Sequence, residues 1–151
     1  MARLAGPAGT ARLMLVGSVG CGKTTLAQRL RDQRLARVKT QTTQYLDTLI
    51  DTPGEYLRHG HLRRALQQAE PGADLVALLQ SASEGQETIP PGFATFFTKP
   101  VIGIITKIDI ADAERRRAAR ERLHRAGARE IIAVSAWTGE GLAELSARLA
   151  R

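Results

Sequence analysis

The residues of this chain that point most directly to a chemical task form one short stretch, GSVGCGKT at positions 17–24. It matches the pattern G-x-x-x-x-G-K-S/T at every fixed position, follows an apolar run and precedes a helical pattern. Glycines let backbone N–H groups approach phosphate oxygens closely, and the start of the following helix adds the positive end of its dipole. We therefore expect a phosphate-binding loop made by Gly17, Ser18, Val19, Gly20, Cys21, Gly22, Lys23, Thr24 and Thr25.

Side chains of this loop and of a second motif have separate tasks in the predicted site. The Lys23 ammonium should reach the β- and γ-phosphates of a nucleotide, and the Thr24 hydroxyl should ligate Mg²⁺. Asp51 ends a later apolar run and begins the pattern D-x-x-G, so its carboxylate can hold Mg²⁺ through a water while the Gly54 N–H meets the γ-phosphate. Taken alone, the same four residues, DTPG, also make a good β-turn.

The third motif, TKID at positions 106–109, predicts which base accompanies the phosphates. It lies at the end of a buried strand pattern, where open parallel sheets bind ligands. The Asp109 carboxylate can accept from two donors on the edge of guanine, whereas adenine presents an acceptor where guanine has its ring N–H. The Lys107 stem would lie over the purine, and a fourth segment, SAW at 135–137, suits a backbone N–H that donates to the guanine oxygen. The expected base-binding residues are Thr106, Lys107, Asp109, Ser135, Ala136 and Trp137.

An alternation of short apolar runs and helical patterns must position these motifs. Nearly continuous apolar strands that alternate with helices predict a mostly parallel sheet covered on both faces. We expect a three-layer α/β/α fold in one domain over 12–151, after a short N-terminal leader over 1–11. Strand patterns cover 12–17, 45–51, 74–80, 101–106 and 130–135, and helical patterns cover 23–32, 57–70, 112–126 and 140–150, with a short one near GFATFF.

The composition restricts the class of protein. Of 151 residues, 43% are hydrophobic and 25% charged, as in globular proteins. No apolar run reaches the roughly 18 residues needed to span a membrane, so no membrane partner is expected. The single cysteine fits a reducing cytosol.

The net charge of +7 comes largely from arginine-rich segments at 29–39 and 114–125. In the second, Ala119, Leu123 and Ala126 mark one buried helix stripe, and the arginines occupy the other faces. Aromatic residues are few, at 4%, and none is interleaved with the arginines, so nucleic acid is not an expected partner. We interpret these segments as solvated helix faces; an anionic partner docking on them is the alternative.

The four motifs in this order resemble the G domain of small GTPases and translation factors, a P-loop NTPase fold. Longer segments around these motifs resemble the EutP/PduV family of ethanolamine and propanediol utilisation, over about residues 12–150. They are GSVGCGKTTL, KTQ, IDTPGEYL, PPGFATFF, KPVIGIITKID and SAWTGEGL. The resemblance implies GTP or GDP and Mg²⁺ as ligands, and a cytoplasmic bacterial protein linked to microcompartments. If the protein is a nucleotide switch, a protein effector would recognise its ordered form, such as a microcompartment shell protein or a catabolic enzyme.

Two positions depart from the Ras-like pattern in ways that bear on hydrolysis. Glu55 follows Gly54 where Ras-like proteins carry a glutamine that orients the attacking water. A carboxylate beside a γ-phosphate would be repelled, and the branched Val19 lies near where an arginine finger would approach. We expect slow hydrolysis, with Lys23, Gly54 and Glu55 as the candidate catalytic residues.

The segment before Asp51 departs as well, because it is short. Thr40, Thr42 and Thr43 are candidates for the switch threonine that binds Mg²⁺, and the resemblance at KTQ favours Thr40. A merely exposed polar loop is the equal alternative. Little room remains for a full second strand, so we expect an abbreviated switch I and second-strand region.

Three functions follow from these expectations. The first is a guanine-nucleotide switch that hydrolyses GTP slowly. The second is a P-loop phosphotransferase that passes the γ-phosphate of ATP or GTP to a short-chain carboxylate, as an acetate kinase does. The third is a nucleotide-bound structural adaptor with almost no turnover.

Overall fold

The computed structural model describes residues 11–18, 20–37, 49–51, 64, 66–68, 70–86 and 88–150, with side chains in 32–37 and 49–51 excepted. Five strands alternate with helices along the described chain, in agreement with the predicted α/β pattern. The strands are β1 (Leu13–Gly17), β2 (Leu49–Asp51), β3 (Leu75–Ser81), β4 (Val101–Thr106) and β5 (Glu130–Ala133). The α-helices include α1 (Lys23–Arg37), α4 (Ala113–Ala126) and α5 (Leu142–Leu149), and residues 64 and 66–68 are helical as well. The short 3₁₀ helices are η3 (Glu70–Gly72), η4 (Phe93–Phe96) and η5 (Ile108–Ile110).

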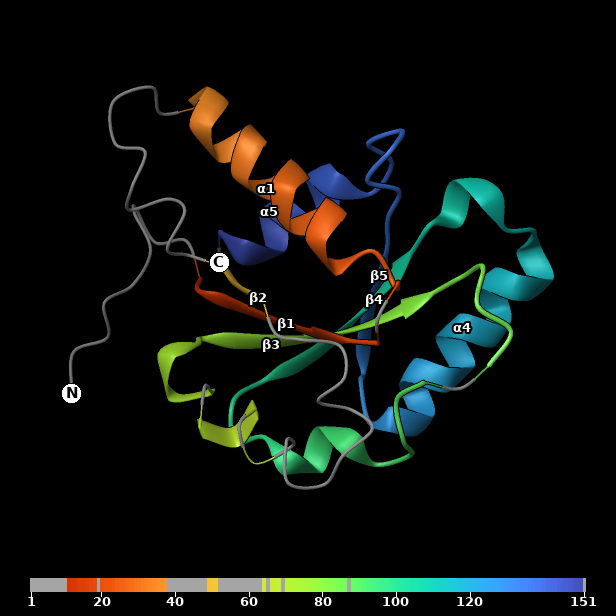
Figure 1. Ribbon diagram of the computed structural model, residues 1–151, viewed down its shortest axis with the longest axis horizontal. Helices are drawn as coiled ribbons and strands as arrows, with labels where there is room; N and C mark the ends of the chain where they lie inside the picture. The colour runs from red at the N-terminus through yellow and green to blue at the C-terminus, as the bar shows by residue number, and fades with distance from the viewer. Residues whose placement is uncertain are drawn as a thin grey trace.

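The five strands form one parallel sheet in the order β2-β1-β3-β4-β5 (Figure 1). Strand β2, which follows α1 in the chain, lies on one side of β1, and β3, β4 and β5 lie on the other side. The order therefore reverses between β1 and β3, and ligands bind at such a switch point, outside the carboxyl ends of the strands. Gly17 at the end of β1 lies beside Leu79 of β3, so the loop after β1 begins at this position.

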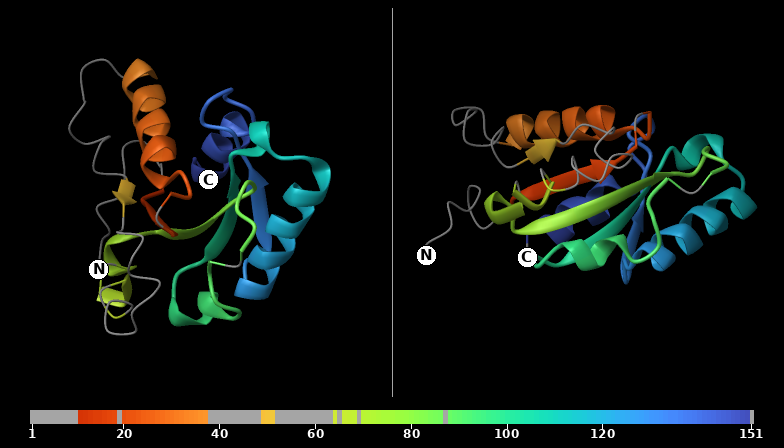
Figure 2. Two further views of the ribbon diagram at one scale, coloured as in Figure 1. Left: turned by 45° about the vertical axis from the view of Figure 1, so that its right-hand side comes forward. Right: turned by 60° about the horizontal axis from the view of Figure 1, so that its bottom comes forward.

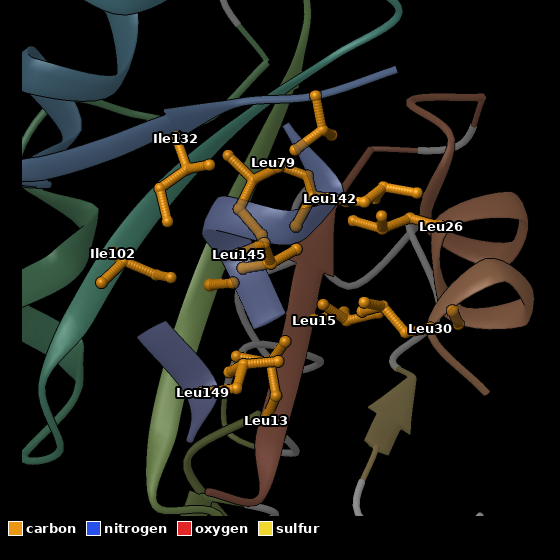
Figure 3. Close-up of a cluster of buried hydrophobic side chains, with 14 of the residues drawn as sticks. Leu13, Leu15, Leu26, Leu30, Leu79, Ile102, Ile132, Leu142, Leu145 and Leu149 are labelled. Atoms are coloured by element: carbon orange, nitrogen blue, oxygen red, sulfur yellow. The ribbon is translucent and has the colours of Figure 1, made fainter. Parts of the chain in front are cut away.

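Helices cover both faces of the sheet, so the fold has the three layers that the sequence predicts (Figure 2). Alternate residues of each strand point to opposite faces. On one face, leucines of α1 and α5 pack against β1 and β3, where Figure 3 shows Leu26, Leu30, Leu142, Leu145 and Leu149 directed toward the strands. The strand residues of this core include Leu13, Leu15, Leu75, Ala77, Leu79, Ile102, Ile104 and Ile132.

The opposite face is covered by α4 and by the segment around η4. The predicted stripe of Ala119, Leu123 and Ala126 is fully buried there, against the other set of strand side chains. Phe93 and Phe97 of the GFATFF segment join the same core, with ring centroids 5.7 Å apart in an edge-to-face arrangement. The short helix predicted in that segment is therefore a core element.

Among the described residues, element boundaries differ from the sequence-based expectations by at most two residues, except at the end of the first helix. Helix α1 continues to Arg37 instead of ending at residue 32, because the added residues include no glycine or proline and are mostly good helix formers. Asp112 is the N-cap of α4, its carboxylate accepting from the Arg115 N–H at 2.8 Å. Only 49–51 of the predicted strand at 45–51 are described, and residues 1–10 and 45–48 lie outside the described part of the chain.

The turn that leads into α5 depends on Gly141, which has φ +80° at the helix N-cap. A Cβ at this position would lie 2.0 Å from the Ala133 carbonyl oxygen, a backbone atom of β5. We expect Gly141→Ala to lower the free energy of unfolding by about 3 kcal/mol, because it combines left-handed strain with a backbone clash. Urea unfolding measures this loss, and Gly85→Ala is the control, since an added Cβ there meets nothing within 4 Å. A loss at position 141 no larger than that of the control would contradict the prediction.

Candidate functional site

The loop between β1 and α1 is a tight turn made possible by glycines. Gly20 and Gly22 have φ of +84° and +97°, values that favour glycine. Position 17 favours glycine for a different reason, which is lack of space. A Cβ there would lie 2.6 Å from the sulfur of the buried Cys21. Val19 lies outside the described residues.

Lys23 begins α1 and folds its side chain back across this loop. Its Nζ donates to the Gly17 carbonyl oxygen at 3.0 Å and reaches the Ser18 carbonyl oxygen at 3.5 Å, and the residue is only 8% exposed. An ammonium held at the mouth of a loop next to a helix N-terminus favours an anion there. A cavity of about 250 Å³ opens at this point, lined by Gly20, Gly22, Lys23, Thr24, Thr25 and Lys107.

The TKID segment after β4 is tied to the phosphate-binding loop by two hydrogen bonds. The Thr106 hydroxyl donates to the Cys21 carbonyl oxygen, and Lys107 Nζ donates to the Gly20 carbonyl oxygen at 2.7 Å. Lys107 has φ 60° and ψ 37°, and it is the only non-glycine residue with positive φ in the described part of the chain. Such strain persists where surrounding contacts over-determine it, and it clusters at functional sites.

Asp109 follows in η5 and is held by the segment after β5. The hydroxyl of the fully buried Ser135 donates to Asp109 Oδ1 at 2.8 Å and accepts from the Thr138 N–H at 3.0 Å. The Asp109 Oδ1 atom is therefore held in place by the Ser135 hydroxyl. An apolar cavity of about 220 Å³ lies at this point, lined by Gly22, Thr25, Leu26, Thr106, Lys107, Asp109, Ile110, Val134, Ala136 and Trp137.

The two cavities share Gly22, Thr25 and Lys107 in their linings, so they adjoin. One has an ammonium and exposed threonine hydroxyls, and the other has apolar walls and one carboxylate. The combination fits a ligand with a polyanionic tail and a flat ring whose edge carries hydrogen-bond donors. The structure thus brings ten of the residues predicted for phosphates and base into two adjoining cavities at the carboxyl ends of the strands: Gly20, Gly22, Lys23, Thr24, Thr25, Thr106, Lys107, Asp109, Ala136 and Trp137. Gly17, Ser18, Cys21 and Ser135 line neither cavity.

Two arginines of α4 support the loops of this end of the sheet, and the sequence analysis missed them. The Arg116 guanidinium donates to the Ile108 carbonyl oxygen and, at 3.2 Å, to that of Ala111, on either side of Asp109. Arg122 donates to the carbonyl oxygens of Glu84 and Gly85 at 3.0 and 3.1 Å. Interpreting all α4 arginines as solvated was therefore wrong for these two, whereas Arg115 and Arg117 are exposed.

The hydrolytic half of the predicted site lies largely outside the described residues. This is the case for Thr40, Thr42, Thr43, Gly54 and Glu55. Asp51 is placed as the last residue of β2, beside Leu15 of β1, without a description of its side chain. Within the described residues no three His, Cys, Asp or Glu side chains group as a metal site, and no helix among them is long and apolar enough to cross a membrane.

Solved structures define the class of protein to which this fold and site belong. Translation elongation factor SelB from Methanococcus maripaludis, in complex with the GTP analogue GPPNHP, aligns with a TM-score of 0.66 at 25% identity, covering 98% of this chain and 34% of its own. Era, in complex with MgGDPNP and 16S ribosomal RNA nucleotides, aligns with a TM-score of 0.64 at 22% identity, covering 91% of this chain and 55% of its own. The protein is an α/β P-loop G domain, and it spans about a third and about half of these two structures.

The particular family follows from the sequence comparison. The PduV-EutP family, described as ethanolamine utilisation - propanediol utilisation, matches residues 10–151, and the chain belongs to this family. Propanediol utilization protein PduV from Citrobacter freundii is 39% identical over 134 residues, which is 89% of each chain. A protein named probable acetate kinase EutP, from Salmonella typhimurium, is 37% identical over 123 residues, or 80% of this chain and 77% of its own. The resemblance inferred from the motifs is thereby confirmed.

Proposed function

We propose that this protein binds a guanine nucleotide together with Mg²⁺ and hydrolyses GTP slowly, as a molecular switch in ethanolamine or propanediol utilisation. The observation that carries the proposal is the Asp109 carboxylate, which buried Ser135 fixes beside an apolar cavity adjoining the phosphate-binding loop. A fixed acceptor next to a ring-sized space, and an ammonium next to a polar space, together support a nucleoside polyphosphate as the ligand.

Guanine is favoured because of what its edge offers to a carboxylate. Guanine presents a ring N–H and an amino group side by side, and both can donate to Asp109. Adenine presents a ring nitrogen lone pair in place of the N–H, which a carboxylate repels. The SelB neighbour, 25% identical, was solved with a GTP analogue, which supports the same preference for this chain.

Mg²⁺ would be held by Thr24 and Asp51, with Thr40 as a further ligand. Hydroxyl and carboxylate oxygens are the hard ligands that Mg²⁺ prefers, and Thr24 lies exposed beside Lys23 at the cavity, so the donor set fits the ion. When bound, the ion neutralises charge on the β- and γ-phosphates. Lys23 would then leave the loop carbonyls that it holds and donate to phosphate oxygens.

Switching would come from the two segments that the sequence predicts to contact the γ-phosphate. Thr40 on one side and Gly54 and Glu55 on the other would be ordered by GTP and released after hydrolysis. Glu55 gives no amide to orient water, and its charge opposes that of the γ-phosphate, so the protein alone should turn over slowly. A protein effector that recognises the ordered form, such as a microcompartment shell protein or a catabolic enzyme in the cytoplasm, would convey the signal.

One experiment tests ligand and rate together. We expect calorimetric titration in Mg²⁺ to show GDP and GTP binding at least about 100-fold more tightly than ATP, because two charge-assisted hydrogen bonds at about 1.5–3 kcal/mol each are lost with adenine. We expect GTP turnover by the same preparation to stay well below one per second without a partner. Equal affinity for ATP would overturn the guanine assignment, and turnover of several per second would overturn the slow switch. Tight retention with no turnover at all would instead favour the structural adaptor.

A phosphotransferase is the second candidate, because relatives in this family are named probable acetate kinase. Acetate oxygen would attack the γ-phosphorus, the bond to the β–γ bridging oxygen would break, and acetyl phosphate and a nucleoside diphosphate would form. Incubation with acetate or propionate and either ATP or GTP, followed by hydroxylamine trapping of acyl phosphate, distinguishes this activity from hydrolysis. Acyl phosphate formed in a 1:1 ratio with the nucleoside diphosphate would mean that the protein is a phosphotransferase and not a switch.

A further inference from the structure

Two large apolar side chains stand exposed at the same cavity. Trp137 is 85% exposed and Ile110 is 62% exposed, and both line the apolar space beside Asp109. Phe96, at 40%, is the only other exposed large apolar side chain among the described residues, and it does not line this cavity. Large aromatic rings are usually well buried, so a tryptophan this exposed at a cavity is a feature to explain.

The backbone under Trp137 is fixed even though its ring is exposed. Within the turn over 135–140, Ser135 accepts from the Thr138 N–H through its hydroxyl and from the Gly139 N–H through its carbonyl, and its own N–H donates to Glu140. The turn therefore fixes the backbone from which the indole projects. Only the two torsions of the side chain remain to be ordered when a ligand covers the ring.

We propose that the Trp137 indole stacks on the nucleobase and supplies much of its binding affinity. This inference rests on the proposed function, and it adds a role for the side chain to the backbone role expected of this segment. The cavity offers aliphatic contacts elsewhere, from the Lys107 stem and Leu26, and the described residues that line it include no second aromatic ring. A purine is flat and polarisable, so an indole at the rim is the surface best matched to its face.

Stacking and base reading are separate contributions in this arrangement. An aromatic face accepts any base, because every base has a π-face, whereas the Asp109 carboxylate distinguishes bases by their edges. Trp137 should therefore set affinity without setting selectivity. Inosine diphosphate, which lacks the amino group of guanine and keeps its ring N–H, separates the two effects.

Intrinsic fluorescence gives the first test, because the chain has one tryptophan. We expect saturating GDP to quench Trp137 emission and to protect it from iodide, since the base would cover the ring. Inorganic tripolyphosphate is the control, because Trp137 does not line the phosphate cavity. It should bind and leave iodide accessibility unchanged.

Affinity of variants gives the second test. We expect Trp137→Ala to weaken GDP and inosine diphosphate by the same factor, about tenfold, and Trp137→Phe to recover most of the loss. Tripolyphosphate affinity and the unfolding midpoint should not change, because the ring is exposed and outside the phosphate cavity.

The outcomes separate this inference from the proposed function. If GDP binds the unaltered protein but Trp137→Ala binds it within twofold and iodide accessibility does not fall, stacking is wrong and the guanine site stands. If the unaltered protein gives no heat with GDP, the proposed function fails and the inference with it. A change in the ratio of GDP to inosine diphosphate affinity in Trp137→Ala would also overturn the separation of roles.

Discussion

Asp109→Asn should bind GDP at least about 100-fold more weakly than the unaltered protein, because two hydrogen bonds to a charged acceptor contribute about 1.5–3 kcal/mol each. An asparagine oxygen can still accept from the Ser135 hydroxyl, so the turn that holds the side chain is preserved. The asparagine amino group would instead donate to the C2 carbonyl of xanthine. Titration with GDP and with xanthosine diphosphate should therefore show a reversal of preference.

Glu144→Gln is the matched control for this substitution. It also converts one carboxylate to an amide, on the exposed side of α5 and away from both cavities. Its GDP affinity should be unchanged. If Asp109→Asn retains GDP affinity within threefold of that control, Asp109 does not read the base, and the class of nucleotide has to be assigned again.

The sheet and the position of the site were predictable because they depend on local patterns. Apolar runs of strand length, each followed by a helical pattern, allow few arrangements other than a parallel sheet. The carboxyl ends of such strands share one edge of the sheet, so motifs at the ends of the first and fourth runs were expected on the same edge. The Lys23 and Asp109 segments accordingly line adjoining cavities.

Contacts between distant elements were not predictable in the same way. Helical spacing distinguishes Arg116 from Arg117, because Arg116 lies three residues before Ala119 and therefore beside the buried stripe, whereas Arg117 does not. The spacing does not give the partners, however, because only the packing of α4 on the sheet brings the Arg116 guanidinium to the Ile108 and Ala111 carbonyls. Likewise, the hydrogen bond from Lys107 Nζ to the Gly20 carbonyl oxygen is made by a residue with a left-handed backbone, and sequence patterns do not predict that conformation for a lysine.

Lys23→Met should abolish most of the affinity for the phosphate tail. The methionine keeps an unbranched stem in the largely buried position and removes the ammonium, which now donates to Gly17 and lies at the phosphate cavity. Charge-assisted hydrogen bonds to two phosphates contribute about 1.5–3 kcal/mol each, so GTP affinity should fall by roughly 100-fold or more. Circular dichroism checks that the variant is folded.

The two substitutions together locate the two ends of the ligand. Lys23→Met should lose tripolyphosphate as well as GTP and keep its weak affinity for guanosine, whereas Asp109→Asn should lose guanosine and keep tripolyphosphate. Lys99→Met controls for the removal of one lysine, because Lys99 lines neither cavity. Lys23→Met that binds GTP within threefold of this control would mean that the ammonium stays on the loop carbonyls when nucleotide is bound. The charge that holds the phosphates would then have to come from another group, and Lys107 is the other cationic residue among the described residues that line this cavity.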